Sequence, residues 1–346
     1  MGNCFRKPKI SYREIGPCDS PAGSPTVRLY GPSSCPRTST IRIALLYKNV
    51  DAEFVPLETP NFGPEAAAVL QCGKETISGP AEKLVRYVDG RFPGPSLLTS
   101  DTAGREPAIV AAARLQHRSM SSHLDQMTRW AEELARRPKV RPRMEVRKLG
   151  QSYSRLVEVM MEHAQMEEKI VFPVLDRADR GMCKTANEEH ARDFPIMNGI
   201  REDIKSIIAL DSGSSWYYEA VSKLVAKLKT LQEHCKEHFE EEEADLLPLL
   251  EEAGMSREQQ ERAVGQYLEE VMEASHSHLF QFLISGLLPA EAMQYLDLIS
   301  RCCSRQRAAT MLRSLIEESS EGAASEQDKS LVVVTPEAAW NQYKRW

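Results

Sequence analysis

The two strings that decide the fold are HAQMEEKIVFPVL, at residues 163–175, and HFEEEEADLLPLL, at residues 238–250. Both follow the pattern His-x-x-x-Glu-Glu-x-x-x-x-Pro-x-Leu, with every position in the same register. His117 and His190 precede the two strings by 46 and 48 residues, about one helix and one loop. The repetition therefore predicts two copies of one helical pair, which together make a four-helix bundle.

Helical periodicity extends this pattern over most of the chain. Apolar residues recur at the α-helical spacing over about residues 106–136, 145–178, 186–210 and 216–252. Short breaks containing Pro, Gly or Ser separate these segments, so consecutive helices should run antiparallel in an up-down bundle. Accessory helices are expected over 253–318, at about 256–286 and 289–318, packed on the outside of the bundle. The Ser- and Glu-rich residues 319–346 predict a mobile tail that contacts an unknown protein partner.

The histidines and glutamates of the two strings are expected to point inward. Residues four apart lie on one helix face, so His163 with Glu167 forms one pair of donors and His238 with Glu242 forms another. The apolar residues in phase with His163 include Leu156, Val159, Met160, Ile170 and Val174.

The first helix offers two histidines, and its apolar stripe chooses between them. Met120, Leu124 and Met127 fall in phase with His117, whereas His123 lies off that stripe. His117 is therefore the predicted core residue.

Charge balance then requires a cation in the core. A buried carboxylate without a partner costs several kcal/mol, and two of them would threaten a marginally stable fold. Imidazoles and carboxylates on four facing helices are the donors with which bundles hold two iron or manganese ions. Zinc accepts histidine, but six nitrogen and oxygen donors without thiolate exceed one closed tetrahedral site. We predict a di-iron centre, with manganese or zinc as a substitute.

Simpler interpretations apply to the neighbouring residues. An isolated His-x-x-x-Glu is usually an exposed ion pair, and only its repetition in register favours a metal. The run Glu240–Glu243 sweeps around the helix, so we assign Glu242 to the centre and the rest to a solvated acidic face. His234 precedes His238 by one turn and is an extra ligand or an outer hydrogen-bond donor.

The helix order and the two strings resemble the hemerythrin family, in particular its HHE cation-binding branch. The resemblance covers residues 106–252 and implies a four-helix bundle with a non-haem di-iron centre, in which the two glutamates bridge or chelate the metals. Phe194 stands where oxygen carriers have a second histidine on the third helix, so reversible oxygen carriage is not expected. The ligands that the resemblance implies are His117, His163, Glu167, His190, His238 and Glu242.

Residues 27–105 read as a separate α/β module. A strand at Val27–Tyr30, a helix through Tyr47 and a strand at Ala52–Leu57 form a βαβ unit. The module resembles the thioredoxin-like N-terminal part of glutathione transferases and glutaredoxins, with Cys35 at the helix start as a possible thiol and Phe92-Pro93-Gly94-Pro95 as a candidate cis-proline segment. Cys35-x-x-Thr38 lacks a second cysteine, so a structural or docking role remains open beside thiol chemistry.

Residues 1–26 form the leader. Its opening, Met1-Gly2-Asn3-Cys4, followed by basic residues, resembles a doubly acylated segment with myristate on Gly2 and palmitate on Cys4. Such a segment would attach a cytoplasmic protein to the cytosolic face of the plasma membrane. A plain flexible tail is the alternative.

Composition excludes other classes of protein. The chain has 346 residues, 44 basic and 50 acidic, and a net charge of −6, so nucleic acid is not an expected partner. Apolar stretches such as Phe280–Leu288 are too short to cross a bilayer. The 8 cysteines lack the spacing of a disulfide scaffold, which is typical of a reduced, cytoplasmic protein.

These observations favour an iron-binding protein that responds to iron, oxygen or redox state, or handles iron, at a membrane surface. No acid and base pair can be identified in the sequence, so binding is favoured over catalysis. The alternatives are a di-iron oxidase or peroxide-handling enzyme, a glutathione-linked thiol enzyme, and a metal-free scaffold.

Overall fold

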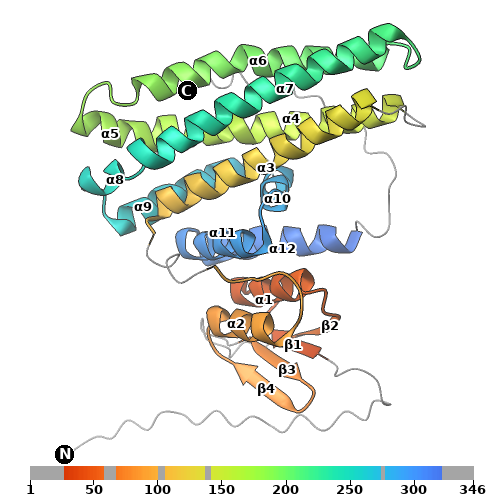
Figure 1. Cartoon of the computed structure of the whole chain (residues 1–346). Coiled ribbons are helices and arrows are strands. Elements are labelled where there is room, and N and C mark those ends of the chain that lie inside the picture. The colour runs from red at the N-terminus through yellow and green to blue at the C-terminus, as the bar shows by residue number, and fades with distance from the viewer. Residues whose placement is uncertain (1–26, 58–67, 100–105, 137–141, 274–276, 322–346) are drawn as a thin grey trace, which may run out of the picture.

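A computed structural model describes residues 27–57, 68–99, 106–136, 142–273 and 277–321. The predicted fold class is confirmed: a small α/β module precedes a mainly helical region that contains a four-helix bundle (Figure 1). The proposed leader, with Gly2 and Cys4, lies outside the described residues, as does nearly all of the proposed tail. The last helix continues to Glu321 and so extends into the expected tail.

The α/β module is a four-stranded sheet in the order β2-β1-β3-β4. Strand β1 pairs parallel with β2 and antiparallel with β3, and β4 closes the edge through a turn at Gly73, whose φ is 61°. Leu29 and Leu70 are register partners and both are buried, which places the apolar core on these central strands. This β-α-β followed by β-β-α is the thioredoxin-like arrangement that the sequence predicts. Its elements are β1 (Val27–Gly31), α1 (Pro36–Tyr47), β2 (Ala52–Pro56), β3 (Val69–Cys72), β4 (Glu75–Ser78) and α2 (Ala81–Arg91).

The candidate cis-proline segment of this module is wrong. Phe92-Pro93-Gly94-Pro95 follows α2, which comes after the last strand, so the segment does not lead into a strand of the sheet. No cis peptide bond occurs among the described residues.

The bundle is formed by four long helices that contact one another in a closed ring. Helix α3 packs on α4 and α7, and α6 packs on the same two helices from the other side. Two of the four predicted helices are interrupted by π-helical turns, which the sequence analysis did not predict. The elements are α3 (Ala108–Arg136), α4 (Pro142–Met166), η2 (Glu167–Val171), α5 (Phe172–Ala178), α6 (Lys184–Ala209), α7 (Ser215–Glu241), η3 (Glu242–Leu246) and α8 (Leu249–Glu252).

The C-terminal region has four helices where two were expected. They are α9 (Arg257–Glu273), α10 (Ser277–Ser285), α11 (Pro289–Cys302) and α12 (Arg305–Glu321). The second expected helix ends early because Cys303 has an extended backbone. Gly265 of α9 lies directly against the carbonyl of Cys302, an approach that a Cβ atom would block.

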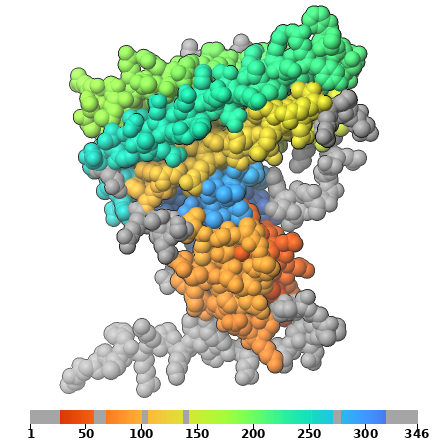
Figure 2. Space-filling model, viewed as in Figure 1, coloured from red at the N-terminus to blue at the C-terminus, as the bar shows by residue number. Residues whose placement is uncertain are grey.

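The C-terminal helices lie between the bundle and the α/β module. Helices α10 and α11 contact α3 of the bundle, while α1 of the module contacts α11 and α12. Figures 1 and 2 show this order of layers, with the blue helices between the bundle and the orange module. In the ranges described above, no helix combines the length and the apolar character needed to span a bilayer. The layer gives the bundle a physical connection to the module.

Candidate metal centre

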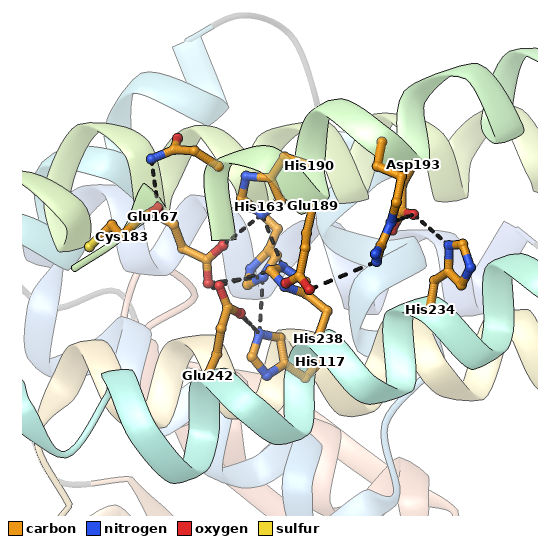
Figure 3. Close-up of polar contacts among 12 residues, drawn as sticks. His117, His163, Glu167, Cys183, Glu189, His190, Asp193, His234, His238 and Glu242 are labelled. Carbon is orange, nitrogen blue, oxygen red and sulfur yellow. Dashed lines mark hydrogen bonds and ion pairs between the residues drawn. The ribbon is translucent and has the colours of Figure 1, made fainter. Parts of the chain in front are cut away.

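The structure brings all six predicted site residues together at the centre of the bundle (Figure 3). Five of the six are at most 4% exposed, and the sixth, His190, is half-buried. Each long helix contributes one ring, and the two π turns contribute the carboxylates. The residues are His117 of α3, His163 of α4, Glu167 of η2, His190 of α6, His238 of α7 and Glu242 of η3.

The six side chains form two groups of four that share both glutamates. Group A contains His117, His163, Glu167 and Glu242. Group B contains His190 and His238 with the same two glutamates. Within each group, one donor atom from every residue lies within 4.8 Å of the others.

In group A, the Nε2 atoms of His117 and His163 are 3.0 Å apart. The His163 Nε2 lies 3.1 Å from Oε1 of Glu167, and the His117 Nε2 lies 3.4 Å from Oε2 of Glu242. Four donors at these separations can surround a single ion at ordinary coordination distances.

Group B repeats this geometry with the other oxygen of each carboxylate. The Nε2 atoms of His190 and His238 are 3.1 Å apart. Oε2 of Glu167 lies 3.4 Å from the His190 Nε2, and Oε1 of Glu242 lies 3.5 Å from the His238 Nε2. Each glutamate thus offers one oxygen to each group, which is the arrangement of a bridging carboxylate.

The π turns explain how the repeated string keeps both its histidine and its leucine inward. Leu175 follows His163 by 12 residues and would point about 120° away from it on a continuous α-helix. The extra residue held by the π turn reduces that offset to about 20°. Leu175 is fully buried, as is Leu250 after the second π turn. Pro173 follows the first turn and lacks the amide hydrogen of a regular helix, which favours the irregularity there.

Each π turn begins at a bridging glutamate. The amide of Leu247 donates to the carbonyl of Glu242 at 2.9 Å, which closes the wide turn five residues on. The amide of Phe172 donates in the same way to Glu167. Such turns are frequent at functional sites because they redirect side chains without ending the helix.

The outer nitrogen of every ring has an oxygen acceptor on a neighbouring helix. His117 Nδ1 donates to Glu243 at 2.9 Å, and His163 Nδ1 donates to the amide oxygen of Gln116 at 2.8 Å. A carboxylate or amide oxygen can only accept, so Nδ1 carries the proton and the Nε2 lone pair faces the centre.

The other two rings complete a closed circuit. His190 Nδ1 donates to Glu168 at 3.3 Å, and His238 Nδ1 donates to Glu189 at 2.7 Å. Contacts therefore run from α3 to α4, from η2 to α6, from α6 to α7 and from η3 back to α3. The four rings are held in place from outside the centre.

The donor set fits a pair of cations. Four Nε2 lone pairs and four carboxylate oxygens converge, and none of the oxygens of Glu167 and Glu242 has a hydrogen-bond partner among the described residues. Buried acceptors without donors are costly. One ion in each group would satisfy all eight atoms.

Without a metal, protons on the histidines can balance the negative charge of the two carboxylates. Burial lowers the pKa of His117, but the carboxylates of Glu167, Glu242 and Glu243 outweigh it and raise that pKa to about 10. Burial also lowers the pKa of His190, and its carboxylate neighbours likewise raise it to about 10. One proton can then sit between the two Nε2 atoms of each pair, where a bound metal would displace it.

An apolar cavity of about 180 Å³ lies beside the centre. His163, His190 and His238 form one wall, and Phe194 lies on another. Phe194 therefore adjoins the cavity and supplies no donor to either group. The remaining lining includes Met120, Met160, Met161, Met197, Cys235 and Phe239.

The two remaining candidates, His234 and Cys35, lie away from both groups, as does His123, which was not predicted to be a ligand. His234 Nδ1 lies 3.0 Å from Oδ1 of Asp193, and His234 belongs to neither group. His123 is buried against Phe282 and donates from Nε2 to that residue's carbonyl at 2.8 Å. Cys35 is buried at the start of α1, in a module that the C-terminal helices separate from the bundle (Figure 1).

Sequence reasoning missed the outer acceptors Gln116, Glu168, Glu189 and Glu243. Glu243 in particular was assigned to the solvated face, whereas its side chain is 30% exposed and holds His117. Each acceptor is next to a ligand candidate in the sequence, and this adjacency was the available signal. Periodicity could not reveal it, because each acceptor serves a ring on a different helix.

Comparisons with known proteins agree with this geometry. Residues 108–250 match the family described as "Hemerythrin HHE cation binding domain". No curated protein matches the sequence. Among solved structures, a Tau class glutathione S-transferase from mango, Mangifera indica, is similar at 16% identity, covering 62% of this chain and 96% of that one. Its TM-score of 0.21 is too low to support an argument. The chain therefore carries, over residues 108–250, a hemerythrin HHE cation binding domain.

Proposed function

We propose that the bundle holds two non-haem iron ions, one in group A and one in group B, with Glu167 and Glu242 bridging them. The observation that carries this proposal is the division of each carboxylate between the two groups. Bound iron would supply an electron-transfer and oxygen-sensitive centre. The chain's own residues orient the rings, exclude bulk water and neutralise the charge.

The cavity beside the centre favours iron over zinc. Each group offers four donors, so donor number alone does not exclude a tetrahedral zinc in each. A metal that prefers six ligands would keep open positions, and the cavity gives a small molecule room beside them. Manganese would accept the same donors.

We further propose that metal occupancy is reported to the rest of the molecule. Gln116, which accepts from His163, donates through Nε2 to the hydroxyl of Tyr295 on α11 at 3.3 Å. Helix α11 contacts α1 of the α/β module. Metal binding fixes the His163 ring and so stabilises the arrangement of α11, because binding free energy is also folding free energy.

Metal analysis of the full-length protein tests the first proposal. Protein produced in iron-supplemented medium should carry two irons per chain, and a variant with His163→Ala and His238→Ala should carry almost none. His278→Ala is the matched control, since His278 is exposed and lies beside Glu158. Zinc alone in the purified protein would refute iron, and absence of any metal would favour a scaffold.

Hydrogen exchange tests the regulatory role. Iron should slow amide exchange in α11 and in α1, as well as in the bundle. If iron slowed amide exchange only in the bundle, metal occupancy would not influence the module.

The cavity supports a second candidate, a di-iron oxidase or a peroxide-handling enzyme. Its position against His190 and His238 would let a small apolar or neutral molecule reach the metals. Consumption of oxygen or peroxide by iron-loaded protein would favour it. We do not extend the proposal to thiol catalysis, because Cys35 is 3% exposed.

Attachment to the cytosolic face of a membrane is a separate proposal that rests on Gly2 and Cys4. Gly2→Ala should move the protein from the membrane fraction to the soluble fraction of a cell. An unchanged distribution would remove the proposed anchor.

A further inference from the structure

We infer that the two metal positions are unequal: group B takes the first ion and binds it more tightly, and group A takes the second. This inference rests on the proposed function, because it concerns how the same two positions are filled. It depends on the acceptors behind the rings rather than on the donors that face the metal.

The inner donors do not distinguish the two positions. Each group has two imidazole Nε2 atoms, one oxygen of Glu167 and one oxygen of Glu242. The Nε2 atoms are 3.0 Å apart in one group and 3.1 Å apart in the other. Any difference in affinity must arise outside this set.

The acceptors behind the rings do differ. Both rings of group B donate to carboxylates, at 3.3 Å to Glu168 and at 2.7 Å to Glu189. In group A, one ring donates to a carboxylate, Glu243, and the other to the neutral amide of Gln116. A carboxylate behind an imidazole makes it a more basic ligand. Group B therefore has the stronger pair of ligands and one more negative charge.

Neighbouring cations increase the difference. The second oxygen of Glu243 lies 3.4 Å from Nε of Arg114, whose side chain is 35% exposed. Glu189 has Arg192 at 3.8 Å, with 49% of that side chain exposed. Each arginine is shared with a second carboxylate, Arg114 with Glu106 and Arg192 with Asp193. Because Arg114 lies closer to its ring acceptor and is less exposed, solvent screens its charge less, and it reduces the negative charge behind group A.

Ring exposure favours the same order. His190 is the most exposed ring, at 14% of its side chain, against 2% for His117. A cavity adjoins each group, because both rings of group B line the apolar cavity and His117 of group A lines a second cavity together with Glu243. The exposure of the rings, and not the cavities, therefore distinguishes the two groups.

A titration of metal-free, full-length protein with Fe(II) under anaerobic conditions tests this order. Calorimetry should resolve two steps whose separation exceeds that of two equal sites. His117→Ala should remove the second step and retain the first. His238→Ala should remove the first. Two steps of equal strength, or loss of the first step in His117→Ala, would overturn the inference.

Outer-acceptor variants keep the test independent of lost ligands. Glu189→Gln should weaken the first step by about 10- to 100-fold, the usual effect of removing such an acceptor. Glu188→Gln, one residue away and 68% exposed, is the matched control and should change neither step. Gln116→Glu should strengthen the second step toward the first. Weakening of the second step alone by Glu189→Gln would contradict the assignment.

The outcomes separate the two proposals. If the wild-type protein binds no Fe(II), the proposed function fails and the inference fails with it. If it binds two ions with equal affinity, the proposed function stands and only the inference is lost. Circular dichroism of each variant shows that a lost step is not a lost fold.

Discussion

The bundle and the α/β module bury their centres equally well, but with opposite chemistry. Glu167 and Glu242 at the bundle centre are 1% and 2% exposed, and Leu29 and Leu70 in the module core are 1% and 0% exposed. The module core is satisfied by its own apolar contacts. The bundle core instead gathers acceptors that only protons or metal ions can satisfy. We therefore expect the stability of the bundle to depend directly on something outside the chain, and that of the module only through the contact of α11 with α1.

Removing the metal should give the largest effect. Chelation of the iron-loaded protein should lower the thermal midpoint of the bundle, since a ligand at 1,000 times its dissociation constant contributes about 4 kcal/mol. The double variant His163→Ala and His238→Ala should melt at one temperature with or without chelator. Differential scanning calorimetry measures both. If the wild type had the same thermal midpoint in iron and in chelator, the stability of the bundle would not depend on metal.

A cavity in the module core should give the next largest effect. Leu70→Ala should destabilise the module by about 2–5 kcal/mol, because Leu70 is fully buried opposite Leu29. Urea unfolding measures the loss, and metal content should stay unchanged. Leu46→Ala on α1 is the matched control, since Leu46 is 48% exposed. A loss of metal in Leu70→Ala would show that the two regions are not independent in this respect.

The link between the two regions should have a smaller effect. Tyr295→Phe removes the hydroxyl that Gln116 contacts and should cost about 1 kcal/mol, the usual net value of such a bond. Iron-dependent protection of α11 from hydrogen exchange should decrease with it. Tyr267→Phe is the matched control, because Tyr267 donates to the carbonyl of Glu162 and not to the ring circuit. An equal decrease in both variants would argue against a route through Gln116.

The repeated string predicts much of this molecule. It contains four of the six residues that the structure gathers into groups A and B, and helical periodicity predicts the face of the helix on which they lie. The spacing ahead of each copy of the string and the resemblance to the hemerythrin family add His117 and His190. The choice of His117 over His123 as a candidate ligand follows from the same phase argument, although His123, which lies off that stripe, is also buried, against Phe282 of α10. The first β-α-β unit of the module also follows from local pattern, whereas β3, β4 and α2 were not predicted.

The remainder depends on contacts that no single segment reveals. A helical wheel assumes 100° per residue, so it misses the π turns at Glu167 and Glu242. Each outer acceptor contacts a ring on another helix. The sequence around Glu243 therefore indicates a surface residue, although Glu243 accepts from His117. The breaks after α9 and α11 arise from packing, as the approach of Gly265 to Cys302 illustrates. The donor types alone do not decide between iron and zinc. The division of the donors into two groups of four appears only in the tertiary structure.

Two buried histidines on α3, His117 and His123, differ in the same way as the two regions do: one has carboxylate neighbours and the other has none among the described residues. Carboxylates raise the pKa of His117, whereas burial lowers the pKa of His123, which faces only the carbonyl of Phe282. His123 is thus neutral in the folded state, and protonation favours unfolding. Its contribution to stability is present above its ordinary pKa of 6.5 and is lost as the pH falls below that value.

The wild type should therefore lose stability relative to His123→Gln between pH 7 and pH 5, by at most about 1.4 kcal/mol per pH unit. Glutamine can donate to the same carbonyl but does not titrate, and the subtraction cancels the protons taken up by the metal centre. Urea unfolding of the iron-loaded proteins across this range measures the difference. Parallel curves would mean that His123 titrates alike in the folded and unfolded chains, so that burial alone does not keep a ring of α3 neutral. Diverging stability curves would show that burial keeps His123 neutral. The neighbouring carboxylates would then explain why His117, on the same helix, has a raised pKa.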